Sequence, residues 1–184
     1  GLIQKELLTK NHAREEVTFN IYKVPFDTTS KFPSVLTVGV DITEQKTYQK
    51  QIQYIALHDE LTKLPNRQLL RAGIEKSLKR AIINKTYSAV LYIDLDFFKD
   101  INDSLGHAAG DKLLIVICNR LLKIANKNDM VSRIGGDEFI LHISNISNDN
   151  QSLVSYTNRI AKLVNASLSK KLLLMNKTFI FLPA

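Results

Sequence analysis

Cysteine is nearly absent from this chain of 184 residues, and its single occurrence, Cys118, excludes an intramolecular disulfide. This usage suits a reducing cytoplasm, and the apolar neighbours of Cys118 predict a buried thiol. Long apolar runs are also lacking, so we expect no membrane segment in this chain, while an anchor upstream in a parent protein stays open. The polar stretch 1–16 lacks the apolar core of a signal peptide.

A basic groove is lacking as well, although the formal net charge is +7. The basic residues are scattered and no aromatic side chains alternate with them, so we expect no nucleic-acid partner. The tightest group, Lys76, Lys79 and Arg80, has helical spacing and is interpreted as a solvated helix face. Hydrophobic residues make up 45% of the chain, which is enough for a real core.

The N-terminal part is predicted to be the end of a β-rich domain. Two strands are expected within 13–43, on either side of a turn-rich stretch at 25–33, because apolar and polar residues alternate around Phe19. A hairpin of this size cannot bury enough surface to stand alone. The rest of its domain is therefore expected upstream.

A linker helix is predicted directly after these strands. Asp41 is expected to cap the helix, with Glu44 reaching back to complete a capping box. Tyr48, Ile52 and Ile55 form one apolar stripe, and so short a helix needs a partner in water. The same helix of a second subunit is one candidate partner, and packing on its own domain is the other.

The remainder of the chain alternates helical and strand patterns. Leu70, Ile74, Leu78 and Ile82 predict a helix with one apolar stripe, and 89–95 is a continuous apolar strand. A later hairpin with two glycines is bounded by further strands and helices. Helices around an antiparallel hairpin predict an α+β fold.

Two carboxylates follow the apolar strand. Asp94 and Asp96, two residues apart, are expected on the same face, where they need a compensating cation. Hard oxygen ligands beside a phosphate substrate favour Mg²⁺, and Lys99 is placed to pair with phosphate. Taken alone, the pattern also fits a capped strand end or a surface ion pair.

The hairpin carries a second acidic pair. Gly135 and Gly136 are expected at its tip, where glycine permits a positive φ and leaves the backbone open to phosphate. Asp137 and Glu138 are expected on opposite faces of the returning strand, one aimed at the site. Taken alone, this stretch also fits an ordinary hairpin turn without a functional role.

Four motifs together resemble the GGDEF domain family: DELTKLPNR at 59–67, DLDFFKDIN at 94–102, GHAAGD at 106–111 and RIGGDEF at 133–139. The resemblance implies a palm-like sheet similar to that of nucleotidyl cyclases, flanked by helices. It implies diguanylate cyclase activity, in which two GTP molecules condense into cyclic di-GMP with release of pyrophosphate.

The resemblance also divides the chain into three parts. The DITE box at 41–44, after a strand, resembles the end of a PAS sensor domain. We therefore expect a PAS remnant over 1–43, a signalling helix over 44–58 and a GGDEF domain over 59–184.

By the same resemblance, Mg²⁺, with Mn²⁺ as the second choice, is expected on Asp94, the Leu95 carbonyl and Asp137. The residues with catalytic or substrate-binding roles are then Asp137, Glu138 and Lys99 for catalysis, Asn102 and Asp111 for guanine, and Phe97 and Phe98 for phosphate. Asp59, Arg67 and His107 match the motifs but are interpreted as structural. Each domain would bind one GTP, so the resemblance implies a homodimer of facing domains, arranged by the linker helix.

Two departures from the family leave alternatives open. Many members of the family carry an inhibitory product site with the pattern R-x-x-D. This chain has Asn126 at the arginine position and keeps the aspartate as Asp129, so we expect no strong product inhibition there. After Phe179 the family continues with a strand, a helix and a basic phosphate-binding segment, which this chain lacks. The alternative is therefore a truncated or degenerate domain that binds GTP without catalysis, and a palm-fold nucleic-acid enzyme is a distant third.

Overall fold

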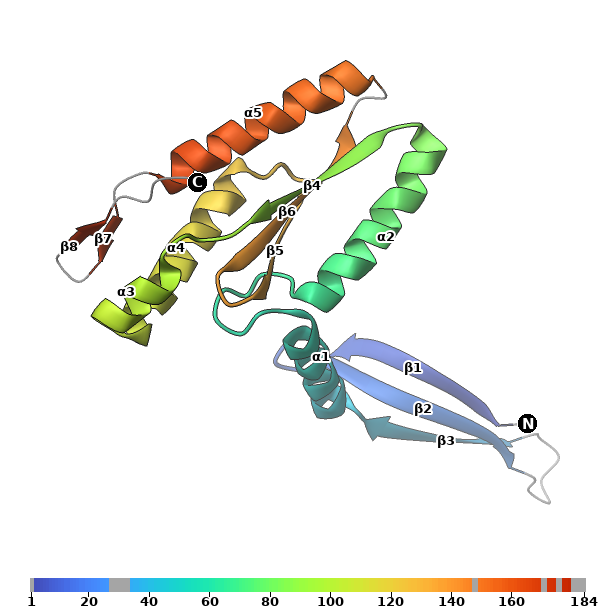
Figure 1. The fold of residues 1–184 in the computed structure, drawn as a ribbon. Coiled ribbons are helices and arrows are strands. Elements are labelled where there is room, and N and C mark those ends of the chain that lie inside the picture. Colours follow the sequence, from blue (N-terminus) through green and yellow to red (C-terminus); the bar gives the residue numbers. More distant parts are fainter. Residues whose placement is uncertain (1, 27–33, 147–148, 170–171, 175–176, 180–184) are drawn as a thin grey trace. The chain divides into compact units, whose positions relative to one another are not determined.

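The structure is a computed structural model that describes residues 2–26, 34–146, 149–169, 172–174 and 177–179 (Figure 1). It divides into two compact units, Gly1–Ala56 and Leu57–Ala184. Among the described residues, no helix is both long and apolar enough to cross a membrane.

Three antiparallel strands form the sheet of the first unit. They are β1 (Ile3–Lys10), β2 (Glu16–Phe26) and β3 (Ser34–Asp41), in the order β1-β2-β3. The two predicted strands are present, but β1 was not predicted. All eight β1 residues are exposed, so no buried face imposed the alternation that marks a strand in a sequence. The predicted turn falls mostly on 27–33, outside the described residues.

Helix α1 (Thr43–Leu57) follows, as predicted to within one residue. Asp41 Oδ1 accepts hydrogen bonds from the backbone N–H of Thr43 at 2.9 Å and from its hydroxyl at 2.6 Å. The predicted capping box is wrong, since Glu44 instead accepts a hydrogen bond from the Tyr48 hydroxyl at 2.8 Å. Because the helix begins at Thr43, Glu44 is only its second residue, one short of the third position that a capping box requires.

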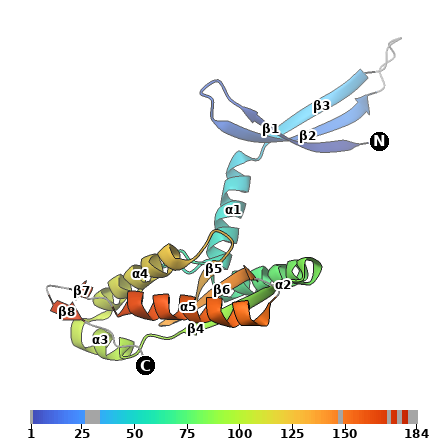
Figure 2. The same ribbon diagram turned by 90° about the horizontal axis from the view of Figure 1, so that it is seen from above.

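The second unit is built around an antiparallel sheet of order β4-β6-β5. Its elements are α2 (Arg67–Asn84), β4 (Tyr87–Ile93), α3 (Phe98–Leu105), α4 (His107–Ile124), β5 (Met130–Gly135), β6 (Glu138–Ile146), α5 (Asn150–Leu168) and the short pair β7 (Leu172–Leu174) and β8 (Lys177–Phe179). Helices α4 and α5 lie against one face of the sheet and α2 against the other (Figures 1 and 2). This arrangement confirms the predicted α+β class.

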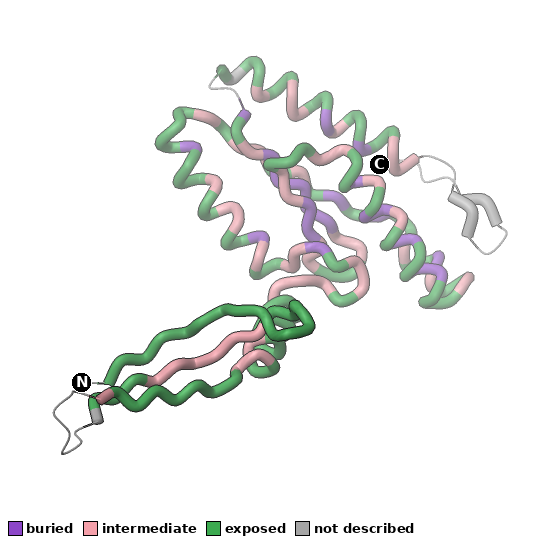
Figure 3. Tube along the Cα trace, turned by 180° about the vertical axis from the view of Figure 1, so that it is seen from behind, coloured by how far each residue is buried: buried purple, intermediate pink, exposed green. Residues whose placement is uncertain are grey.

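The main core lies between α4, α5 and the sheet, where the trace is most deeply buried (Figure 3). Leu113 and Leu121 of α4 pack with Phe139 and Leu141 of β6, and all four are fully buried. Burying each such side chain contributes about 1.5–3 kcal/mol. Cys118 belongs to this core, which confirms the predicted buried thiol.

The apolar stripe predicted for α2 is only partly right. Leu70 is buried, but Leu78 is 50% exposed and Ile82 is 79% exposed. Residues spaced four apart drift by about 40° per step around an α-helix, so Ile82 has turned by about 120° from Leu70. The buried face instead includes Ala81, which is 7% exposed, and so presents smaller side chains to the sheet than the sequence indicated.

Candidate active site

Strand register brings the two acidic motifs together. Ile93, the last residue of β4, pairs with Phe139 of β6, so Asp94 follows at the level of Glu138. Gly135 pairs with Glu138, which leaves Gly136 and Asp137 as the two-residue tip. The prediction that Asp137 lies on the returning strand is therefore wrong. Of the two glycines, Gly136 alone has a positive φ, 38°.

The gathered acids repel one another. The pKa of Asp94 is raised by desolvation first, then by the negative charges of Asp137, Glu138 and Asp96. Among the described residues no three His, Cys, Asp or Glu side chains are grouped as a metal site. A metal would therefore take two carboxylates, a carbonyl and substrate oxygens. This all-oxygen donor set with excess negative charge fits Mg²⁺.

A tight turn leads from these acids into α3. Leu95 is 5% exposed, and its carbonyl accepts a long hydrogen bond, 3.3 Å, from the Phe98 N–H. Phe97 caps α3 at a φ of 60°, with no side-chain hydrogen bond to the helix. The first N–H groups of a helix lack intrahelical acceptors and favour anions. Exposed Lys99 lies in this first turn, next to the acidic Asp100, and phosphate binding at the start of α3 stays a prediction.

Asn102 and Asp111 come from neighbouring helices. A Cβ placed on Gly110 would lie 2.0 Å from the Asn102 Oδ1, so the Asn102 side chain rests directly on the backbone of α4. Only glycine permits this approach. Asp111 is the next residue and is exposed. The amide and the carboxylate predicted to bind guanine are therefore close together, and their role in binding stays a prediction.

Tyr92 is a residue that the sequence analysis missed. Its hydroxyl donates a short hydrogen bond to Glu138 Oε1, and this bond is the first cause that raises the pKa of Tyr92 to about 12. Tyr92 stands two residues before Asp94, so strand alternation was a signal that placed it on the same face.

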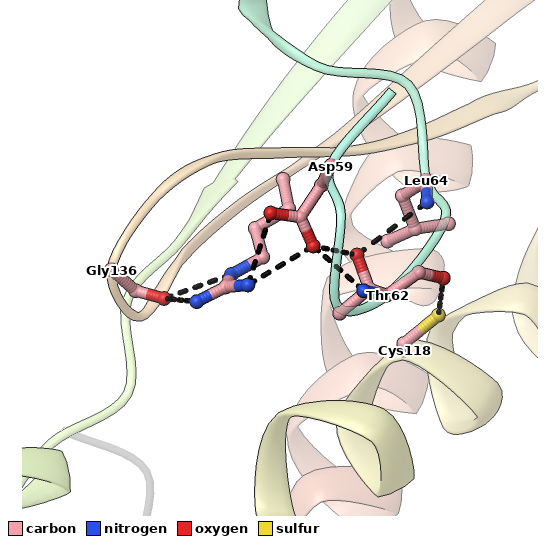
Figure 4. Close-up of polar contacts among 6 residues, drawn as sticks. Asp59, Thr62, Leu64, Cys118 and Gly136 are labelled. Carbon is pink, nitrogen blue, oxygen red and sulfur yellow. Dashed lines mark hydrogen bonds and ion pairs between the residues drawn. The ribbon is translucent and has the colours of Figure 1, made fainter. Parts of the chain in front are cut away.

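A polar clamp fixes the hairpin (Figure 4). Arg133 of β5 donates from Nη1 to both Asp59 oxygens, at 3.0 and 3.1 Å, and from Nη2 to the Gly136 carbonyl at 2.6 Å. The Asp59 Oδ1 also accepts the Thr62 N–H at 2.7 Å and the Thr62 hydroxyl at 2.5 Å. The backbone of Thr62 in turn accepts a weak hydrogen bond from the Cys118 thiol. Asp59 is thus structural, as predicted, and it braces the tip that carries Asp137.

The other two residues interpreted as structural lie at helix starts. Arg67 begins α2, and its positive charge acts on Tyr92, whose pKa it lowers slightly against the larger effects of Glu138. His107 begins α4 and is exposed.

The residues at the position of the family's product site, Asn126 and Asp129, are hydrogen-bonded to other groups of the protein. Asp129 Oδ2 accepts the Asn126 N–H at 2.8 Å, and its Oδ1 accepts the Ser144 N–H at 3.3 Å. Asn126 Nδ2 donates to the Tyr156 hydroxyl at 2.8 Å, and Arg159 lies 5.1 Å from the centroid of the Tyr156 ring. These groups line a cavity of about 620 Å³. The weak product binding expected there stays a prediction.

Curated proteins similar to this chain are bacterial signalling proteins. MucR of Pseudomonas aeruginosa, a bifunctional diguanylate cyclase/cyclic di-GMP phosphodiesterase, is 46% identical over 94 residues, covering 51% of this chain and 14% of the relative. TpbB of the same species, a diguanylate cyclase, is 36% identical over 129 residues, covering 66% and 30%. The probable diguanylate cyclase DgcE of Escherichia coli is 43% identical over 114 residues, covering 60% and 10%. The chain thus spans less than a third of these relatives.

Solved structures agree. The GGDEF domain of Pseudomonas aeruginosa TpbB is similar with a TM-score of 0.62 at 37% identity, over 67% of this chain and 69% of that one. A sensory box/GGDEF family protein of Caulobacter crescentus also gives 0.62, at 30% identity over 68% and 78%. The family model described as diguanylate cyclase, GGDEF domain, matches residues 56–177. The chain therefore belongs to the GGDEF family.

Proposed function

We propose that this domain is a diguanylate cyclase, which joins two GTP molecules into cyclic di-GMP and releases two pyrophosphates. In each transfer a ribose 3′-oxygen forms a bond to the α-phosphorus of the other GTP, and the bond from that phosphorus to pyrophosphate breaks. The observation that carries the proposal is the meeting of Asp94, Asp137 and Glu138 beside the start of α3.

Different residues of the site would bind the metal ion and the phosphates. Asp94, Asp137 and the Leu95 carbonyl would hold Mg²⁺, or Mn²⁺, which when bound offsets charge at phosphate and favours the ionised 3′-hydroxyl. Lys99 and the backbone around Phe97 and Phe98 would hold the phosphates.

Guanine would be held by the pair between α3 and α4. The Asp111 carboxylate accepts from the N1–H and the amine of guanine, and the Asn102 amide serves another edge atom. Glu138 keeps its orientation through the Tyr92 hydroxyl, which leaves its other oxygen for the site. Catalysis of this kind is positioning with charge stabilisation.

A homodimer is part of this proposal, because each domain would present one GTP to the other. The stripe on α1 supports it: Tyr48, Ile52 and Ile55 are 54%, 66% and 71% exposed. We place the signalling helix at α1, with a PAS remnant before it and the catalytic domain after it. Since GTP is a cytoplasmic nucleotide, we place the activity in the cytoplasm.

The test is incubation of the chain with GTP and Mg²⁺, with chromatographic separation of the nucleotides. Asp137→Ala is expected to abolish cyclic di-GMP. Glu75→Ala is the matched control, since it removes an acid from the exposed Arg71–Glu75 pair on α2. Product from Asp137→Ala at the parent rate would overturn the assignment.

A non-catalytic GTP-binding module is the second candidate. PdeR of Escherichia coli, named a cyclic di-GMP phosphodiesterase, is 38% identical to this chain over 109 residues, so such a sequence also occurs in a protein named for a different activity. This candidate predicts GTP binding that Asp111→Ala weakens, with no product formed under any metal.

Product inhibition gives a further test. Cyclic di-GMP is expected to bind the cavity beside Asn126 weakly, because Asn126 stands where the family motif has a charged donor and Asp129 is engaged by two backbone N–H groups. Asn126→Arg is expected to tighten binding about tenfold or more in calorimetry. Tight binding by the parent that Asp129→Ala abolishes would contradict this expectation.

A further inference from the structure

The C-terminal end of α2 carries apolar side chains on its solvent side. Ile82 and Ile83 are each 79% exposed, and Leu78, one turn earlier, is 50% exposed. Tyr87, the first residue of β4, is 44% exposed. Isoleucine is among the residues most often fully buried, and neighbouring exposed apolar side chains mark an interaction site where single ones do not. We call these four side chains the α2 patch.

The α2 patch is accompanied by cations and lacks acids in its own segment. The stretch from Lys76 to Ile93 contains no Asp or Glu. At 100° per residue, Lys79 lies between the two isoleucines around the helix, one turn before Ile83. Lys85 caps the helix and is exposed. Within the described residues neither lysine forms an ion pair, so both charges are available to an anionic partner.

This combination fits an anionic lipid surface better than a protein partner. Four side chains offer less than the about 800 Å² that each partner buries in a stable protein complex, and lysine is depleted at such interfaces. At a membrane, apolar side chains enter the acyl boundary, while long lysine stems keep their ammonium groups among the headgroups. Tyrosine, which has an apolar ring and a polar hydroxyl, is also enriched at this boundary.

We propose that the α2 patch is a peripheral docking surface for membranes that contain anionic lipid, with Ile82 and Ile83 inserted and Lys79 and Lys85 among the headgroups. Each isoleucine contributes about tenfold to partitioning and each lysine about fivefold. The patch lies where β4 begins, whereas Asp94 follows the end of this strand. Docking therefore leaves the acidic site at the opposite end of β4 accessible to substrate.

Flotation of the whole chain with lipid vesicles tests the proposal. Vesicles of equal parts phosphatidylcholine and phosphatidylglycerol are expected to bind the chain about fivefold or more tightly than vesicles of phosphatidylcholine alone. Ile82→Ser should weaken binding to the anionic vesicles about tenfold and Lys79→Gln about fivefold. The matched controls, Leu122→Ser and Lys123→Gln, change exposed residues of α4 on the other face of the sheet and should bind as the parent does. Binding that neither α2 variant weakens would overturn the proposal.

A tryptophan reporter separates insertion from simple charge attraction. The chain contains no tryptophan, so Ile82→Trp places a single fluorophore in the α2 patch and Leu122→Trp places one on α4. Emission from the first is expected to shift to shorter wavelength when the anionic vesicles are added, and emission from the second to stay unchanged. Equal shifts of both reporters would contradict insertion at α2. A shift of the first that grows with protein concentration in the absence of lipid would identify a second copy of the chain as the occupant and overturn the proposal.

Discussion

Arg133 and Asp59 are 74 residues apart in sequence, and their contact holds the hairpin tip against the segment before α2. Both side chains are mostly buried, at 12% and 22% exposure. Charged hydrogen bonds in such a setting contribute roughly 1.5–3 kcal/mol, far more than an exposed ion pair. Asp59 therefore acts on the hairpin tip through Arg133.

Asp59→Asn is expected to lower the free energy of unfolding of the second unit by about 2 kcal/mol, because one charged partner of Arg133 is lost. Amide signals of β5 across a urea series measure it. Arg71→Gln, which breaks the exposed pair with Glu75, serves as control and should change little. If both variants had the same small effect, the clamp would be no more than a surface contact.

The same carboxylate makes stability depend on pH. Desolvation alone would raise the pKa of Asp59, but hydrogen bonds from Thr62 and Arg133 outweigh it, and the net shift is downward. A lowered folded pKa means that this contribution is complete above the ordinary value of 3.8 and is lost as pH falls through the folded value.

Tyr92 offers a direct spectroscopic reading of its contact with Glu138. The pKa of its phenol is raised to about 12, first because the hydrogen bond to Glu138 favours the protonated form. We expect one of the six tyrosines to ionise later than the others in an ultraviolet titration, and this late step to vanish in Tyr92→Phe. Glu138→Gln should move the step back toward pH 10. An unchanged late step in either variant would contradict the contact.

At the scale of elements, helices were predicted better than their packing. The α1 pattern located the helix correctly, because a cap and an apolar stripe act locally. The buried face of α2 was misjudged, because Ala81 carries little hydrophobic signal although it is buried in the structure. Strand β1 was missed because all its residues are exposed, so its sequence lacks the alternation that a buried face would impose. Its pairing with β2 is visible only in the folded structure.

The α1 stripe provides the test of the dimer. Ile52→Asp places a charge on the exposed stripe and is expected to weaken self-association at least tenfold in sedimentation equilibrium, because burying an unpaired carboxylate is unfavourable. Gln53→Asp adds the same charge about 100° away around the helix and should dimerise normally. Equal dimerisation by both variants would remove α1 from the interface.

At the scale of the whole molecule, the motif acids were predictable but their mutual placement was not. Spacing alone put Asp137 on a strand, whereas the register with β4 puts it at the tip, opposite the end of β4. The closeness of Asn102 to Asp111 depends on a glycine in the next helix, which only the packed structure reveals. Contacts between segments far apart in sequence, such as Asp59 with Arg133, have no local pattern at all.

His142 links a cavity between α2 and the sheet to the stability of the second unit. Desolvation lowers its pKa below the ordinary value of 6.5, although Asp129 opposes this in part, and the cations of Lys76, Arg80 and Lys127 share its cavity. The unfolded chain therefore binds the proton more readily than the folded one, so stability is complete above pH 6.5 and falls as pH drops toward the folded value. His142→Leu removes this dependence and also the unpaired Nε2, so the variant should be more stable than the parent at pH 5.5 and lose less between pH 7.5 and 5.5. Urea series at both pH values, followed at β6 amides, measure this, with His12→Gln in the first unit as control. Parallel losses in the parent and in His142→Leu would show that His142 is already satisfied in solution.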